Sequence, residues 1–143
     1  MERRSNIIEK VIEVKRVSKK NAGGNRIHHT ALVVAGDKAG HIGFYIGKAP
    51  TLTEAIRKAS KKAQTNMLTV KLVDGTVPYE KRIKKGAAKI IVKPAPPGSG
   101  LIAGGAVRNV LELAGVKNAS AKILGTNNKA MNVLATIELL TSY

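Results

Sequence analysis

The stretch 51–67, TLTEAIRKASKKAQTNM, decides how the first half of this chain folds. Thr51 and Glu54 have the spacing of a capping box, in which a hydroxyl and a carboxylate satisfy free backbone donors at a helix start. Apolar residues recur three and four positions apart and basic residues fill the opposite side, which predicts an amphipathic helix to about residue 67. The apolar face holds Leu52, Ala55, Ile56, Ala59, Ala63 and Met67, and the basic face holds Arg57, Lys58, Lys61 and Lys62.

Three segments ahead of this helix have the composition of strands. β-Branched residues mix with charges over 6–18, and apolar residues recur over 27–35 and 42–46. The connection 36–40 has glycine at both ends, which suits a hairpin. These segments predict a three-stranded antiparallel sheet on which the helix docks.

The second half repeats the mixture of strands and helices. Strands are expected over 68–73, 89–93 and 116–124, and a Pro- and Gly-rich loop over 94–100. A helix is expected over 102–114, ended by Gly115, and a last helix begins at Asn127 or Asn128. The order βββα followed by ββαβα predicts an α+β protein with two sub-domains, residues 1–70 and 71–143.

Positive charge dominates the composition. The chain has 25 Lys and Arg against 9 Asp and Glu, a net charge of +16, and both halves are basic. Nucleic acid is the commonest partner of such a protein. An acidic membrane surface is the second candidate and is disfavoured because the apolar face of the basic helix consists mostly of Ala. A membrane span is not expected, because no apolar run approaches ~20 residues. With one Phe, three Tyr and no Trp, contacts to phosphates fit better than stacking on bases. The absence of cysteine excludes disulfides and thiolate sites.

Two basic segments are candidates for phosphate contact. Residues 19–26 are predicted to form a mobile loop in which Lys19, Lys20 and Arg26 neutralise phosphates and Gly23 and Gly24 allow close approach; a plain hairpin connection is the less favoured interpretation. The basic helix face has two interpretations that stay open. It binds phosphate, or it is a solvated face with a Glu54 to Lys58 pair.

We expect a protein without enzymatic activity and without a cofactor or metal ion. The Gly-rich segment 98–105 lacks the third Gly of the dinucleotide fingerprint and the Gly-Lys-Ser/Thr of a P-loop, so it is interpreted as a tight turn that brings a helix close to the sheet. The segment loosely resembles the phosphate loop of small-molecule kinases, but the second half has no tight acidic pair for magnesium. His28 and His29 are adjacent in a strand and point to opposite faces.

Ten collinear motifs between about residues 8 and 140 resemble bacterial-type small-subunit ribosomal protein S5, and the Gly-rich block is highly specific for that family. They are RVSK (16–19), GG (23–24), TALVV (30–34), GD (36–37), GKA (47–49), EAI (54–56), NM (66–67), IAGGAVR (102–108), VLELAGV (110–116) and ATI (135–137).

The resemblance implies an amino-terminal domain similar to double-stranded-RNA-binding domains and a carboxy-terminal βαβ domain with two helices on a sheet. It implies a location in the ribosome, cytoplasmic or organellar, near the mRNA entry channel. It also implies an effect on decoding accuracy and contacts with small-subunit rRNA, mRNA at the entry channel, and ribosomal proteins four and eight. Lys85, Gly86 and Ala87 would face protein four. An extra-ribosomal double-stranded-RNA-binding module is the alternative. The expected RNA-binding residues are Arg16, Lys19, Lys20, Gly23, Gly24, Arg26, Lys48, Arg57, Lys61, Lys93 and Arg108.

Overall fold

The first half of the chain forms one antiparallel sheet with a helix. The computed structural model describes residues 7–21 and 23–142, without the side chains of 19–21, 25 and 26. The strands pair in the order β1-β2-β3-β4, so the predicted three-stranded sheet has a short fourth strand. The elements are β1 (Ile8–Asn21), β2 (Gly24–Gly36), β3 (His41–Ala49), α1 (Leu52–Thr65) and β4 (Leu68–Thr69).

The second half forms a mixed sheet with two helices, which confirms the predicted α+β class. Its strands pair in the order β5-β6-β8-β7. β7 and β8 run parallel and are joined by α2, which is the βαβ unit that the resemblance implied. The elements are β5 (Lys81–Lys85), β6 (Ala88–Pro94), β7 (Leu101–Ile102), α2 (Gly105–Ala114), β8 (Ala119–Leu124) and α3 (Lys129–Thr141).

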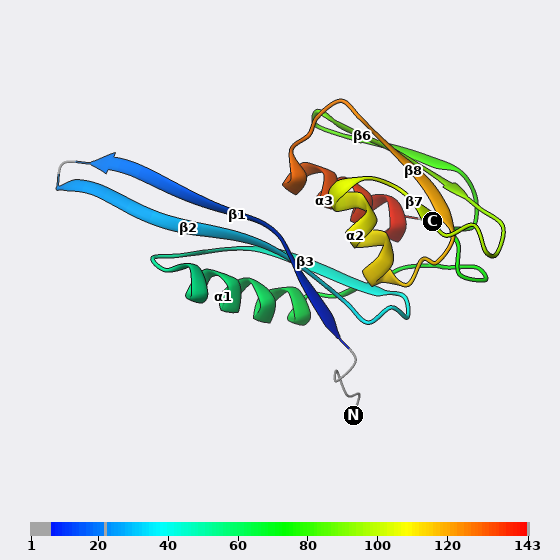
Figure 1. Cartoon of the computed structure of the whole chain (residues 1–143), viewed down its shortest axis with the longest axis horizontal. Coiled ribbons are helices and arrows are strands. Elements are labelled where there is room, and N and C mark those ends of the chain that lie inside the picture. The colour runs from blue at the N-terminus through cyan, green and yellow to red at the C-terminus, as the bar shows by residue number, and fades with distance from the viewer. Residues whose placement is uncertain (1–6, 22, 143) are drawn as a thin grey trace.

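The elements stack in four layers (Figure 1). α1 covers one face of the first sheet, α2 and α3 lie between the two sheets, and the second sheet forms the outer layer on the far side. One apolar core runs through the middle, because Val34 of β2, Leu111 of α2 and Ile90 of β6 belong to the same buried cluster. The two halves therefore share a core and present α1 and the second sheet as their outer layers.

The contact between α1 and the first sheet depends on small residues on both sides. Ala55, Ala59 and Ala63 of α1 are fully buried. A Cβ at Gly47 of β3 would lie only 2.5 Å from the Ala55 carbonyl oxygen and 3.0 Å from the Ala59 Cβ. The close approach explains why alanines spaced by four line one face of the helix, while its basic residues face outward.

The β2–β3 turn connects the first sheet to α2. The backbone amides of Lys38 and Gly40 donate to the carbonyls of Leu113 and Ala114, at 2.9 Å each, and so satisfy acceptors that the last turn of a helix leaves free. Gly115, in the left-handed conformation, ends α2 as predicted. The turn of one half is thus the end cap of a helix in the other.

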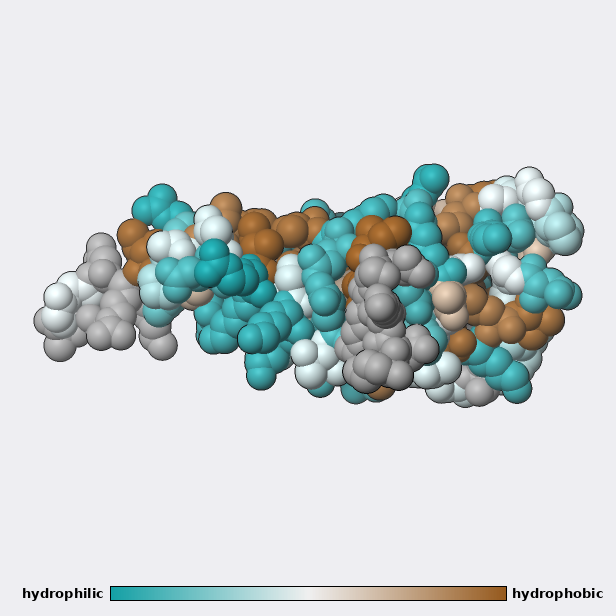
Figure 2. Space-filling view, turned by 90° about the horizontal axis from the view of Figure 1, so that it is seen from below, coloured by the Kyte–Doolittle hydropathy of each residue, from teal (hydrophilic) through white to brown (hydrophobic). Residues whose placement is uncertain are grey.

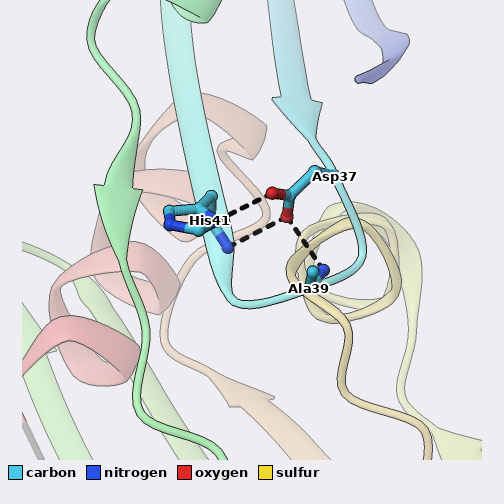
Figure 3. A network of polar contacts seen from close by, with 3 residues as sticks. All are labelled: Asp37, Ala39 and His41. Atoms are coloured by element: carbon cyan, nitrogen blue, oxygen red, sulfur yellow. Dashed lines mark hydrogen bonds and ion pairs between the residues drawn. The ribbon is translucent and has the colours of Figure 1, made fainter. Parts of the chain in front are cut away.

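An aspartate holds this turn in shape (Figure 3). Asp37 Oδ1 accepts from the amides of Ala39, at 2.8 Å, and His41, at 3.2 Å, while Oδ2 lies 2.7 Å from His41 Nδ1. Burial raises the pKa of Asp37, but the hydrogen bonds of Ala39 and His41 and the charge of His41 lower it more in sum. The pKa of Asp37 therefore lies below its usual value, which means that the ionised carboxylate stabilises the turn more than the neutral acid does.

The prediction of a loop over 19–26 was wrong. β1 and β2 remain paired to their ends, with Lys19 opposite Arg26 and Asn21 opposite Gly24, so strand pairing occupies most of the predicted loop; residue 22 of that loop lies outside the described residues. Gly24 has a φ of 118°, which allows the tight reversal. The paired strands project beyond α1 and the rest of the body (Figure 1). A local sequence rich in Lys, Asn and Gly does not reveal that cross-strand pairing continues through it.

Several element boundaries also differ from the expectations. The strand predicted over 68–73 ends at Thr69, and Val73 only bridges to Thr76 around a turn; β5 was missed within the basic stretch 79–89. Ile102 belongs to β7 rather than to α2. Gly98, Gly100 and Gly105 have positive φ, whereas Gly104 is extended. A Cβ at Gly104 would meet no atom within 4 Å, so that residue does not serve a close approach of helix and sheet.

Candidate nucleic-acid interface

A basic hollow of about 320 Å³ lies between the end of β3 and the outer face of α1. α1 supplies residues at spacings of three and four, which one helix face brings together, and the β3 end supplies the facing wall. We call this site the α1 hollow; its lining residues are Lys48, Ala49, Pro50, Glu54, Arg57, Lys58 and Lys61. Figure 2 views the side of the molecule on which α1 lies and shows hydrophilic residues over that helix.

The positive charge of the α1 hollow is not neutralised within the described part of the chain. Its one acid, Glu54, is held in the capping box: Thr51 Oγ1 donates to Glu54 Oε1 at 3.1 Å and accepts from the Glu54 amide at 3.4 Å. The pair between Glu54 and Lys58, which belonged to one of the two interpretations of this helix face, is not formed. Lysine and arginine ion pairs of the described residues lie elsewhere, at Lys10–Glu112, Lys15–Glu13, Arg82–Glu80 and Lys85–Glu138.

A histidine of the neighbouring strand positions the wall of the α1 hollow. His29 Nδ1 lies 3.1 Å from the Pro50 carbonyl oxygen, which can only accept a hydrogen bond, so Nδ1 carries the proton. This contact joins β2 to the connection between β3 and α1. His29 therefore has a structural role that the sequence did not reveal, because its partner is 21 residues away.

Three of the expected RNA-binding residues, Lys48, Arg57 and Lys61, meet in the α1 hollow. Arg16 is exposed on β1 opposite His29 and does not line the hollow. The backbones of Lys19, Lys20 and Arg26 continue the projecting hairpin, but their side chains lie outside what the structure describes. Gly23 and Gly24 are exposed at its tip.

The remaining expected contacts lie in the second half. Lys93 is exposed on β6 and Arg108 is exposed on α2. Lys58 lies on the predicted basic helix face but was not among the expected contacts, and it lines the α1 hollow. Its position one turn from Glu54 and Lys61 is the sequence signal that could have assigned it to this site.

The segment expected to contact a protein forms the β5–β6 turn. Lys85 is only partly exposed and its Nζ lies 3.3 Å from Glu138 Oε1 of α3. Gly86 has a φ of 59°, and a Cβ there would lie 2.8 Å from Met131 Cε. Gly86 and Ala87 are both exposed. The positive φ therefore favours glycine at this turn, whereas the methionine methyl group lies at the end of a flexible side chain and can shift.

The described residues, 7–21 and 23–142, contain no group of three or more His, Cys, Asp or Glu side chains that could hold a metal ion. None of the described helices is long and apolar enough to cross a membrane.

Fold and surface together define a basic two-part α+β protein in which four cations of the described residues line one hollow on the outer face of α1. Comparison with known families identifies it further. Residues 7–71 match the family model of the ribosomal protein S5 N-terminal domain, and residues 83–143 match that of the ribosomal protein S5 C-terminal domain. The chain is 46% identical over 135 residues to small ribosomal subunit protein uS5 of Lawsonia intracellularis (strain PHE/MN1-00), an alignment that covers 94% of this chain and 83% of the relative. The chain belongs to the ribosomal protein S5 family, as the sequence motifs predicted.

Proposed function

We propose that this protein is a structural component of the small ribosomal subunit that binds small-subunit rRNA through phosphate contacts. The α1 hollow carries the proposal, because it places Lys48, Arg57, Lys58 and Lys61 around one space without an ion pair among the described residues. Charge-assisted bonds from Lys and Arg are the usual contacts to phosphate oxygens. Membership of the S5 family supports the same conclusion.

The finer assignments belong to the same proposal. The projecting β1–β2 hairpin, with Arg16, Lys19, Lys20 and Arg26 on its strands, reaches RNA beyond the body. The β5–β6 turn at 85–87 contacts ribosomal protein four, and ribosomal protein eight is a second neighbour. A location near the mRNA entry channel lets the protein influence decoding accuracy. The division into residues 1–70 and 71–143 is supported by family matches that end at 71 and resume at 83.

The test is the affinity of the purified chain for small-subunit rRNA in a filter-binding assay. If at least six phosphates are contacted, affinity should fall roughly 10³-fold between about 50 and 200 mM salt, because bound protein displaces condensed cations. The double variant Arg57→Gln with Lys61→Gln should bind roughly tenfold or more weakly and reduce the salt slope by about two. An affinity that does not respond to salt would contradict phosphate binding.

A matched control separates the α1 hollow from net charge. Lys71→Gln with Lys117→Gln removes two exposed lysines that do not line the hollow. This control should bind nearly as the parent does, and equal losses in both double variants would show that only total charge matters. Gradient sedimentation of a cell extract distinguishes the extra-ribosomal alternative, since a subunit component sediments with the small-subunit peak.

A further inference from the structure

His29 of the first sheet lies between the α1 hollow and a further cation. Ala31 of β2 and Ala55 of α1 belong to one buried cluster, so His29, two residues before Ala31, lies on the α1 side of the sheet. Strand register places Arg16 of β1 and Ala49 of β3 directly opposite His29 on its two neighbouring strands. Arg16 is exposed, and Ala49 lines the hollow. An RNA backbone that runs from Arg16 into the α1 hollow therefore crosses His29.

The contact with Pro50 decides the hydrogen-bonding character of both ring nitrogens of His29. Nδ1 donates to the Pro50 carbonyl oxygen at 3.1 Å. In a neutral imidazole one nitrogen donates and the other accepts, so Nε2 is left as an acceptor. Among the described residues Nε2 has no hydrogen-bond partner. The side chain is only partly buried, which leaves part of the ring accessible to a ligand.

This acceptor differs in kind from the other groups of the α1 hollow. The four cations that line the hollow can only donate, and phosphate oxygens accept from them. The one acidic side chain of the lining, Glu54, already accepts from Thr51 in the capping box. An ionised phosphate cannot satisfy His29 Nε2, because it has no proton to donate. A ligand that satisfies this acceptor must carry a donor close to its phosphates.

The ribose 2′-hydroxyl is a donor of this kind. Each nucleotide of RNA carries one 2′-hydroxyl beside its phosphate, and this group can donate or accept a hydrogen bond. The sugar–phosphate backbone of DNA carries no hydrogen-bond donor. A phosphate-binding site with an acceptor at its wall therefore favours RNA over DNA without reading the base sequence.

We infer that His29 is a specificity-determining residue, whose Nε2 accepts a hydrogen bond from a ribose 2′-hydroxyl of RNA held in the α1 hollow. Pro50 orients the ring and selects the tautomer in which Nε2 accepts. The inference rests on the proposed function, since it names the chemical group that selects RNA at the same site. The adjacent His28 has no such role, because neighbouring residues of a strand point to opposite faces.

Two short duplexes of the same sequence test the inference. One is unmodified RNA, and the other has 2′-fluoro nucleotides, which keep the phosphates and the A-form shape but lack the 2′-hydroxyl donor. In a filter-binding assay the parent should bind the hydroxyl duplex roughly three- to tenfold more tightly than the fluoro duplex, the range expected for one hydrogen bond. Equal binding by the parent would overturn the inference. This comparison needs no substitution, so it does not depend on the folding of a variant.

Substitutions of His29 separate its two ring nitrogens. In His29→Asn the amide nitrogen takes the place of Nδ1 and can still donate to Pro50, but no acceptor remains at the position of Nε2. This variant should lose affinity for the hydroxyl duplex alone, so that it binds both duplexes equally, with a melting temperature near that of the parent. His29→Gln, whose side-chain oxygen reaches the position of Nε2, should retain the preference. His28→Asn is the matched control and should prefer the hydroxyl duplex as the parent does.

The outcomes distinguish this inference from the proposed function. An equal loss of affinity for both duplexes in His29→Asn would assign the ring to phosphate binding or to the shape of the hollow, and would overturn the inference. A preference for the hydroxyl duplex that survives in this variant would overturn it as well. In either case the proposed function still stands if Arg57→Gln with Lys61→Gln loses affinity for small-subunit rRNA. Failure of the parent chain to bind any RNA would end both proposals.

Discussion

The substitution Gly36→Ala should destabilise the protein by separating β2 from α2. Gly36 is buried at the end of β2 and has no positive φ, so alanine meets no backbone strain there. A Cβ at this position would overlap the Leu113 carbonyl oxygen and lie 2.7 Å from its carbon and 2.8 Å from its Cβ. Ordinary carbon contacts are about 3.5–4.0 Å, so α2 would have to move by about 1 Å.

Overpacking of this kind costs about 1–3 kcal/mol of the free energy of unfolding. For a chain of this length the melting temperature falls by roughly 3 °C per kcal/mol, so we expect a decrease of about 3–9 °C in scanning calorimetry. A shift of α2 also lengthens the hydrogen bonds from the Lys38 and Gly40 amides to the end of α2. The substitution should therefore weaken the contact between the two halves as well.

Gly104→Ser is the matched control, because a Cβ at Gly104 has no atom within 4 Å and its φ is −100°. A serine at this helix N-cap should leave the melting temperature unchanged or raise it slightly. An unchanged melting temperature for Gly36→Ala would refute the close contact between β2 and α2.

Two acidic residues give further predictions. Asp37→Ala should lower the free energy of unfolding by about 1–2 kcal/mol at pH 7 by removing the acceptor of the Ala39 and His41 amides. The folded-state pKa of Asp37 is lowered from 3.8, so the stability that its ionised form adds is present above pH 3.8 and should disappear as the pH falls through the folded-state pKa. A difference in the free energy of unfolding between the parent and Asp37→Asn that does not change with pH would contradict this. Glu112→Gln breaks the 2.7 Å pair with Lys10, whose hydrogen bond is the main cause of the lowered pKa of Glu112. Since both side chains are partly exposed, urea unfolding should show a loss below about 1 kcal/mol. The loss should be full above the usual pKa of 4.5, disappear as the pH falls through the lowered folded-state pKa of Glu112, and be absent in 1 M salt; a loss that persists in salt would assign it to packing.

Features with a local physical cause were predictable from sequence. Thr51 caps α1 and Asn128 caps α3 with their own side chains, and Gly115 ends α2 in the left-handed conformation. Each signal depends on a few neighbouring residues. The same holds for the basic face of α1, since helical spacing alone places Arg57 and Lys61 together. The family motifs were also readable because they are collinear along the chain.

Features that depend on strands meeting across the chain were not predictable in this way. The segment 19–26 looked like a loop because its composition is polar, yet pairing between β1 and β2 continues to Asn21 and Gly24. The alternation in β5 was hidden in a run of lysines.

The sequence by itself determined that the protein is basic, α+β and poor in aromatic residues, and it therefore predicted contact with phosphates rather than stacking on bases. Only the tertiary structure decided which cations act together. Lys48 and Arg57 line one hollow because β3 ends beside α1, and Lys84 pairs with Lys89 on the neighbouring strand because β5 turns back onto β6. Charge and propensity are properties of single residues, whereas a binding surface depends on packing and register, which arise only when distant segments bury a common core.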